Sequence, residues 1–221
     1  KELESTQAML LGPGWGQEKG TAQFLSKLIG AEGDVMKAKI GFVHPSAKQE
    51  VKPFKLPPLV VDADALKLLA AIPDWPQHLP ANTILTPHPG EMAKLTGMEK
   101  DAIQTDRVGT AIRFAKEWGH VVVLKGAYTV VAAPDGRATL IPFATSALAR
   151  ACTGDVLAGA IAGLLAQGMA PYAAAVAGAY LHARAGELAA EELGTTASVM
   201  AGDVLERLAE AMAGIGSRGR N

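Results

Sequence analysis

Residues 147–159 read Ala-Leu-Ala-Arg-Ala-Cys-Thr-Gly-Asp-Val-Leu-Ala-Gly, so a polar Thr153-Gly154-Asp155 step runs into a long Ala-rich apolar segment. This pattern predicts a helix that begins at the polar step. The first turn of a helix has unpaired backbone N–H groups and a partial positive charge, which together attract a phosphate. Asp155 stands in that turn, so one short segment can both hold an anion and remove a proton. The competing interpretation is that Asp155 only caps the helix.

Composition is typical of a single globular domain or a large part of one. Of the 221 residues, 49% are hydrophobic and 19% charged, which is enough for a sizeable core. Lys and Arg number 21 against 22 Asp and Glu, so no basic excess points to nucleic acid or to a membrane surface. The single cysteine, Cys152, excludes an internal disulfide. Together with the polar opening residues, which do not form a signal peptide, it predicts a cytoplasmic location.

One stretch is long enough to span a bilayer. Residues 156–183 contain no Asp, Glu, Lys or Arg. They are rich in Ala and Gly rather than Leu and Phe, and Gly168 and Pro171 interrupt them, as at the end of one helix and the start of the next. The stretch therefore predicts two close-packed helices buried in a globular domain, and no membrane span.

Strand and helix patterns alternate along the chain. The predicted helices are 19–29, 65–71, a helix from Met92, 101–118, a helix after residue 155, 171–193 and 201–212. The predicted strands are 8–11, 59–61, 83–86 and 121–124, followed by a hairpin of 128–133 and 137–141 about Pro134-Asp135-Gly136. Residues 30–58 are expected to form an irregular surface excursion, and 214–221 a frayed tail. Alternation predicts an α/β fold with a mostly parallel sheet and helices on both faces.

Polar turns follow the predicted strands. They are Gly-Pro-Gly-Trp-Gly at 12–16, Asp62 with Asp64, His-Pro-Gly-Glu at 88–91, and Lys125-Gly126. The carboxyl ends of parallel strands meet at one edge of a sheet, so these turns should converge there with the Thr-Gly-Asp step. Each alone has an ordinary explanation as a cap or a solvated loop, and for Asp64 capping of the next helix is preferred. Their convergence favours a ligand site.

Several of these segments occur together, in the same order, in a known family. They are Gly-Pro-Gly-Trp-Gly (12–16), Asp-Ala-Asp-Ala-Leu (62–66), Thr-Pro-His-Pro-Gly-Glu-Met (86–92), Leu-Lys-Gly-Ala-Tyr-Thr (124–129) and Thr-Gly-Asp-Val-Leu-Ala-Gly (153–159). The chain resembles the ADP- or ATP-dependent NAD(P)H-hydrate dehydratases, a branch of the ribokinase-like superfamily. The resemblance implies repair of hydrated NADH or NADPH by phosphorylation of the ring hydroxyl with Mg²⁺, then loss of phosphate. It also implies a homo-oligomer, a tetramer or larger.

The resemblance assigns roles to individual residues. Asp155 would be the base, and the N–H groups of Thr153 and Gly154 would stabilise the transferred phosphoryl group. Glu91 would act near the metal through water. Nucleotide contacts are implied for Lys125, Gly126, Ala127, Tyr128, Thr129 and Gly154, and substrate contacts for Gly14, Gly16, His88 and Asp155.

The sequence departs from the family pattern at several places. Cys152 replaces a common Gly and is expected to crowd the phosphate loop. Arg150 stands where a small residue is usual and is expected to be a solvated surface arginine, while Thr145 replaces a frequent Asn. Nothing before Ala8 corresponds to the family's opening strands and Gly-Gly-Ser segment. We therefore expect residues 1–221 to form a single dehydratase domain lacking its N-terminal segment, without the epimerase domain fused to some relatives.

Two other functions fit parts of the pattern. A ribokinase-like kinase of a vitamin precursor would share the fold, the anion site and the base, but such kinases tend to carry Asn at the position of His88. A non-catalytic nucleotide-binding remnant is favoured by Cys152 and by the missing opening strands.

Overall fold

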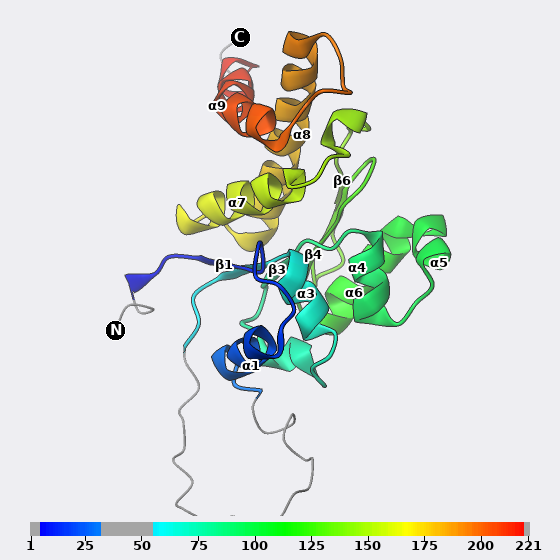
Figure 1. Cartoon of the computed structure of the whole chain (residues 1–221), viewed down its shortest axis with the longest axis vertical. Helices are drawn as coiled ribbons and strands as arrows, with labels where there is room; N and C mark the ends of the chain where they lie inside the picture. The colour runs from blue at the N-terminus through cyan, green and yellow to red at the C-terminus, as the bar shows by residue number, and fades with distance from the viewer. Residues whose placement is uncertain (1–4, 32–54, 219–221) are drawn as a thin grey trace, which may run out of the picture.

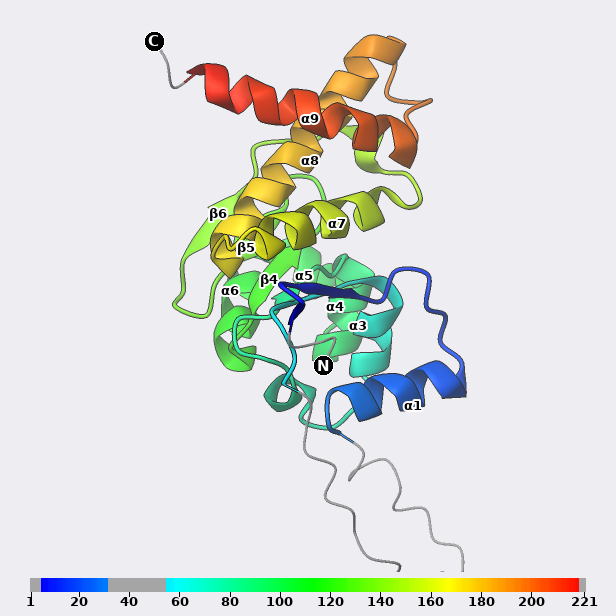
Figure 2. The ribbon, with the colours of Figure 1, turned by 90° about the vertical axis from the view of Figure 1, so that its left-hand side faces the viewer.

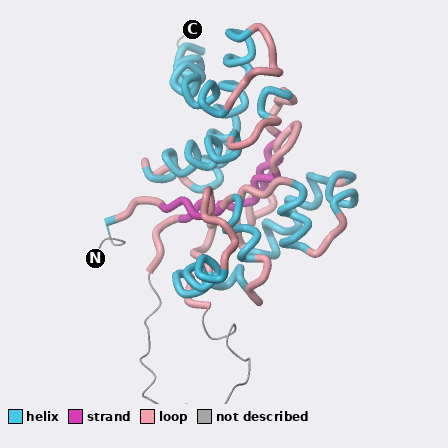
Figure 3. The backbone as a smooth tube through the Cα atoms, viewed as in Figure 1, coloured by secondary structure: helices cyan, strands magenta, loops and turns pink. Residues whose placement is uncertain are grey.

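The computed structural model describes residues 5–31 and 55–218. Most of the predicted excursion at 30–58 lies outside these residues. The helices are α1 (Lys19–Leu28), α3 (Ala63–Leu69), α4 (Pro89–Thr96), α5 (Lys100–Thr105), α6 (Arg107–Trp118), α7 (Thr153–Ala166), α8 (Pro171–Leu193) and α9 (Ala201–Arg218), with short 3₁₀ turns η2 (Trp75–His78) and η3 (Ser146–Leu148). The strands are β1 (Met9–Leu11), β2 (Leu59–Val61), β3 (Ile84–Leu85), β4 (Val121–Leu124), β5 (Val130–Ala132) and β6 (Ala138–Leu140) (Figure 3).

The six strands form one sheet in the order in which they occur along the chain. Strands β1 to β4 are parallel, with Leu10 opposite Val60 and Val60 opposite Ile84. Parallel neighbours need a crossover connection, and helices supply it here. Strands β5 and β6 continue the sheet as an antiparallel hairpin, as predicted. All four parallel strands therefore place their carboxyl ends at the same edge.

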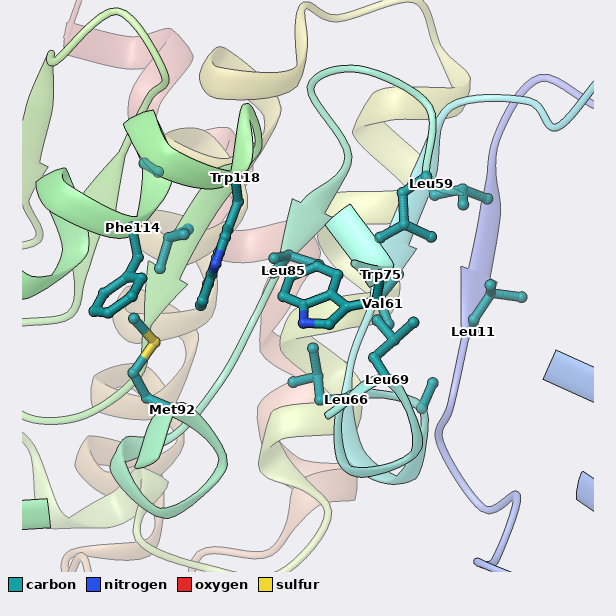
Figure 4. Close-up of a cluster of buried hydrophobic side chains, with 14 of the residues drawn as sticks. Leu11, Leu59, Val61, Leu66, Leu69, Trp75, Leu85, Met92, Phe114 and Trp118 are labelled. Carbon is teal, nitrogen blue, oxygen red and sulfur yellow. The ribbon is translucent and has the colours of Figure 1, made fainter. Parts of the chain in front are cut away.

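Helices cover both faces of the sheet (Figures 1 and 2). Because successive strand residues point to opposite faces, Val61 and Leu85 enter one apolar core while Val60 and Ile84 enter the other. The first core lies under α1, α3, α4 and α6, and Figure 4 shows its large side chains, including Trp75, Phe114 and Trp118. The second lies under α7, α8 and α9. The prediction of a mostly parallel sheet flanked on both faces is confirmed.

Several element boundaries differ from the predictions. The single helix predicted at 101–118 is two helices, because Asp106 has non-helical backbone angles and its side chain accepts a hydrogen bond from Gly109 N to begin α6. Helical periodicity over 101–118 predicts Val108 on the same apolar face as Ile112, but Val108 lies in the first turn of α6 and is 43% exposed. Helices α3 and α4 start earlier than predicted, at Ala63 and Pro89. The predicted frayed tail is helical to Arg218 as part of α9.

The Ala-rich stretch forms α7 and α8, as predicted. The two helices pack against each other, and Gly178 lets α8 approach Ile161 of α7 so closely that an added Cβ would lie 2.5 Å from that side chain. Across the residues that the structure describes, no helix combines the length and apolarity needed to cross a bilayer.

Candidate functional site

The N-terminus of α7 is open. Its first flanking residue, Cys152, has φ +65° and contributes no side-chain cap. Within the described residues, the backbone N–H groups of Thr153 and Gly154 have no hydrogen-bond partner, whereas Asp155 N donates to Cys152 O at 3.1 Å. The Thr153 hydroxyl lies 2.8 Å from the carbonyl of Leu148, to which it donates, and this contact fixes the preceding turn. Two unpaired donors at a positive helix end form a site for an anion.

The N-terminus of α4, at the same edge, is closed. His88 Nδ1 accepts hydrogen bonds from Gly90 N (2.9 Å) and Glu91 N (3.2 Å), and Glu91 Oε2 accepts one from His88 N (2.9 Å). This is a reciprocal capping box with histidine at the cap. Burial lowers the pKa of His88, which keeps the ring neutral and able to accept. Of these two helix ends, only α7 has donors left for a ligand.

A lysine lies beside the open end of α7. Lys125 follows β4, and its Nζ is 2.6 Å from Asp62 Oδ1 and 3.8 Å from Glu91 Oε2. Both carboxylates are buried. A Cβ added to Gly154 would lie 3.4 Å from Lys125 Nζ, so the absence of a side chain there leaves the ammonium group room against the helix end. Two carboxylates therefore hold a positive charge next to the two unpaired N–H groups.

A cavity of about 370 Å³ opens at this point. That volume lies within the range of small-molecule sites. One part of its wall is polar and includes Lys125, Thr153 and Gly154; another is apolar and includes Ile141 and Phe143. The remaining wall residues are His88, Pro89, Gly126, Ala127, Thr129, Thr145, Leu148, Ala149, Arg150, Leu157, Ala179, His182 and Ala183. The arrangement suits a ligand with a flat apolar part and an anionic part.

An arginine outside the cavity holds the loop after β4. Arg107, at the start of α6, donates from one guanidinium nitrogen to the carbonyl of Leu124 at 3.0 Å and from another to the carbonyl of Ala127. These carbonyls bracket Lys125 and Gly126. Gly126 has φ +150°, and a Cβ there would lie 2.8 Å from the guanidinium group. Arg107 thus fixes the backbone that carries Lys125.

A model of the NAD(P)H-hydrate dehydratase family matches residues 1–209. The chain belongs to this family. It is 45% identical over 182 residues to a bifunctional NAD(P)H-hydrate repair enzyme of Moorella thermoacetica, covering 80% of this chain and 34% of the relative. It is 40% identical over 149 residues to an ADP-dependent (S)-NAD(P)H-hydrate dehydratase of Neisseria meningitidis, covering 66% of this chain and 50% of that protein. The chain thus spans a third to a half of the length of these relatives.

Solved structures agree on the fold. The ADP/ATP-dependent NAD(P)H-hydrate dehydratase of Bacillus subtilis, co-crystallised with ATP and Mg²⁺, has 30% sequence identity and a TM-score of 0.73, and the alignment covers 96% of this chain and 67% of that one. The predicted ribokinase-like α/β fold is confirmed by this likeness and by that to a ribokinase-like protein.

The structure gathers most of the residues that the family resemblance assigns. Seven of them, His88, Lys125, Gly126, Ala127, Thr129, Thr153 and Gly154, line the cavity. Asp155 is exposed in the first turn of α7, beside the cavity rather than in its wall. Tyr128, Glu91, Gly14 and Gly16 are also outside the wall. Tyr128 is 51% exposed, and Glu91 is buried beneath His88.

The glycine turn after β1 is held by an aspartate. Gly16 N donates to Asp64 Oδ2 at 3.0 Å, and Gln17 and Lys67 both donate to Asp64 Oδ1. Asp64 makes no cap hydrogen bond to α3, so the preferred capping role was wrong: its carboxylate is already engaged by this turn. A Cβ on Gly12 would collide with the carbonyl of Asp62 at 1.9 Å, so the turn lies directly against the end of β2.

Two of the three departures from the family pattern occupy the cavity wall. Thr145 lines the cavity and caps η3, where its hydroxyl accepts from Ala147 N at 3.2 Å. Arg150 is exposed, but it lines the cavity and donates to the carbonyl of Ala197 at 2.6 Å, so it is not merely solvated. Cys152 is exposed and outside the wall. The expected crowding of the phosphate loop by its thiol is therefore not seen.

Two residues at this site escaped the sequence analysis. His182 of α8 lies in the cavity wall. The sequence offered a signal for it, because His182 is the single histidine in the stretch 156–183, which contains no Asp, Glu, Lys or Arg. Arg107 had no such signal, because its role depends on two carbonyls across the fold.

The carboxylates at the site suit a Mg²⁺ ion that is bound mainly by substrate phosphates and water. No group of three or more His, Cys, Asp or Glu side chains that would hold a metal occurs among the described residues. Mg²⁺ is commonly bound through one or two carboxylates, substrate phosphates and water, so this donor set fits. Glu91 is already hydrogen-bonded to His88, which favours contact through water over direct ligation.

Proposed function

We propose that this protein is an ADP- or ATP-dependent dehydratase of hydrated NADH and NADPH. The observation that carries the proposal is the open N-terminus of α7 with Lys125 beside it, in a chain of the dehydratase family. The activities of its relatives from Neisseria meningitidis and Bacillus subtilis support the same reaction. We further propose that it works in the cytoplasm as a homo-oligomer.

Each group has a place in the reaction. The terminal phosphoryl group of the nucleotide would lie over the N–H groups of Thr153 and Gly154, where they and Lys125 stabilise its developing charge. Bound Mg²⁺, near Glu91, would supply further neutralisation of the phosphate charge. Asp155, exposed in the same turn, would accept the proton of the substrate hydroxyl. The apolar wall at Ile141 and Phe143 suits the nucleotide base.

The reaction balances without a further reactant. The ring hydroxyl oxygen attacks the terminal phosphorus, its proton goes to Asp155, and the bond from phosphorus to the nucleotide breaks. The lone pair of the adjacent ring nitrogen then expels phosphate. Loss of a proton from the neighbouring ring carbon restores the dihydropyridine. Phosphorylation thus makes a leaving group, and no stable phosphorylated product should accumulate. His88, Gly14 and Gly16 would face the nicotinamide ring.

The test follows two products at once. The protein is mixed with Mg²⁺, ADP or ATP and hydrated NADH, and near-ultraviolet absorbance and free phosphate are recorded together. We expect both to rise in equal amounts and only with nucleotide present. A stable phosphorylated small molecule would point to a kinase instead. Nucleotide binding with neither signal would point to a non-catalytic remnant.

A further inference from the structure

A buried histidine in the cavity wall has an unused ring nitrogen. His182 is only 6% exposed, and its Nε2 has no hydrogen-bond partner among the described residues. Its ring nevertheless lines the cavity beside Thr153 and Ala183. Burying an unpaired polar atom costs free energy, so such atoms are rare unless a ligand or water satisfies them. A ring nitrogen without a partner, in a residue of the cavity wall, therefore indicates that His182 contacts the bound ligand.

The chemistry of that nitrogen follows from its neighbours. The backbone of Thr153 favours the protonated form of the ring, as a carbonyl that accepts from a ring N–H does. Because Nε2 is unpartnered, the donor is Nδ1. Burial and the charge of Lys125 lower the pKa of His182 to about 4, so the ring is neutral at pH 7. In a neutral ring with a proton on Nδ1, Nε2 carries a lone pair and accepts.

We propose that His182 is a nucleotide-binding residue whose Nε2 accepts a hydrogen bond from a hydroxyl or amino group of the nucleotide. The inference rests on the proposed function, because it requires a nucleotide in the cavity. Phosphate oxygens are acceptors too, so a lone pair at this position does not suit them. The two donors of adenosine phosphates are the ribose hydroxyls and the amino group of the base. His182 would therefore position the nucleoside part while α7 and Lys125 hold the phosphates.

The chain contains a matched control. His120 is also buried and has one unpartnered ring nitrogen, Nδ1, while its Nε2 lies 3.0 Å from the carbonyl of Pro76. Its ring stacks on Trp75 at a centroid distance of 6.2 Å, away from the cavity wall. The two histidines share burial and an unused nitrogen, but only His182 belongs to the cavity wall. Only His182 should respond to nucleotide.

The experiment compares one variant that removes the unused nitrogen of His182 with one that keeps a polar group in its place and with a variant of the control histidine. In His182→Asn, the amide nitrogen can replace Nδ1 and Nε2 is lost. In His182→Gln, a polar group remains near Nε2, and His120→Gln keeps the contact to Pro76. ADP affinity is measured by calorimetry with the full chain. We expect His182→Asn to weaken ADP binding about tenfold, the loss of one hydrogen bond. His182→Gln should recover part of it, and His120→Gln should match the wild type.

Two further measurements separate the possible donors. Binding of 2′-deoxy-ADP, 3′-deoxy-ADP and IDP is compared between wild type and His182→Asn, and the analogue that lacks the contacted group should bind both proteins equally. If every analogue still binds His182→Asn about tenfold more weakly, no nucleotide donor reaches Nε2 and the proposal is wrong. Ring ¹⁵N spectra should show a shifted but unprotonated Nε2 of His182 with ADP. An imidazolium signal instead would mean a phosphate contact and overturn the assignment.

Failure of the inference and failure of the proposed function are distinguishable. A wild-type protein that does not bind ADP at all contradicts the proposed function, and the inference with it. A wild type that binds ADP as tightly as His182→Asn does, with equal thermal stability, contradicts the role of His182 alone.

Discussion

At the scale of single residues, Asp155 is exposed to solvent in the same helical turn as the anion site, where it is free to meet a substrate hydroxyl. We predict that Asp155→Asn lowers turnover by about two orders of magnitude or more, because general-base catalysis is lost while Asn can still serve the helix start. Turnover is measured by phosphate release, and folding by thermal melting. Asp101→Asn, which removes another exposed acid from the first turn of a helix, should leave turnover unchanged. Near-normal turnover of Asp155→Asn would place the base elsewhere.

Cys152 holds a backbone conformation that non-glycine residues rarely adopt, with φ +65°. We predict that Cys152→Gly raises the free energy of unfolding by about 1 kcal/mol, because glycine removes the left-handed strain. ADP affinity should stay unchanged, since the thiol is outside the cavity wall. Urea unfolding and calorimetry measure the two effects. A gain in affinity would show that the thiol obstructs the ligand after all.

At the scale of elements, the start of α4 depends on His88, which serves as both cap and cavity wall. We predict that His88→Ala lowers the free energy of unfolding by about 1 kcal/mol and that His88→Asn does not, because Asn is a good N-cap. If His88 also faces the substrate, His88→Asn should still raise KM for hydrated NADH. Denaturant unfolding and initial rates test both. Unchanged KM in His88→Asn would limit the residue to its capping role.

The loop after β4 depends on the guanidinium group of Arg107, which contacts two carbonyls that one ammonium group cannot hold in the same way. We predict that Arg107→Lys raises KM for the nucleotide by about three- to tenfold and changes kcat less, since Lys125 is displaced but still present. Arg113→Lys, on the same helix but exposed beside Glu117, is the control. Equal KM in both variants would show that the loop keeps its shape without Arg107.

Local patterns predicted the elements well and the contacts between them poorly. The Thr153-Gly154-Asp155 helix start, the 134–136 hairpin turn and the α7–α8 pair follow from composition and turn chemistry, and the structure has them. The break at Asp106 was missed because helical periodicity continues across it, whereas the break arises from one side chain capping Gly109. The hydrogen bonds of Asp64 to the glycine turn and of Arg107 to the loop after β4 were missed for another reason. Both depend on groups brought together only by the fold.

At the scale of the whole molecule, three buried or half-buried histidines make stability depend on pH. Burial lowers the pKa of His88, of His120 and of His182, the last to about 4. In the unfolded chain a histidine titrates near 6.5. Between these values the unfolded state binds more protons than the folded state, so stability rises with pH and falls as pH drops below 6.5. The hydrogen bond from Lys67 lowers the pKa of Asp64 below its usual 3.8, so Asp64 stops stabilising the fold only at more acidic pH. The loss of stability just below pH 6.5 therefore reports on the histidines.

We therefore predict that the free energy of unfolding decreases from pH 7 to pH 5, by about 1.4 kcal/mol per pH unit for each histidine that stays neutral in the fold. His182, whose pKa burial lowers to about 4, should contribute down to about pH 4. Urea unfolding at half-unit pH steps measures the slope. In His182→Asn the slope should be smaller by one histidine's share, because Asn does not titrate. A stability that is flat between pH 7 and pH 5, or a slope that His182→Asn leaves unchanged, would mean that the ring accepts a proton inside the folded protein.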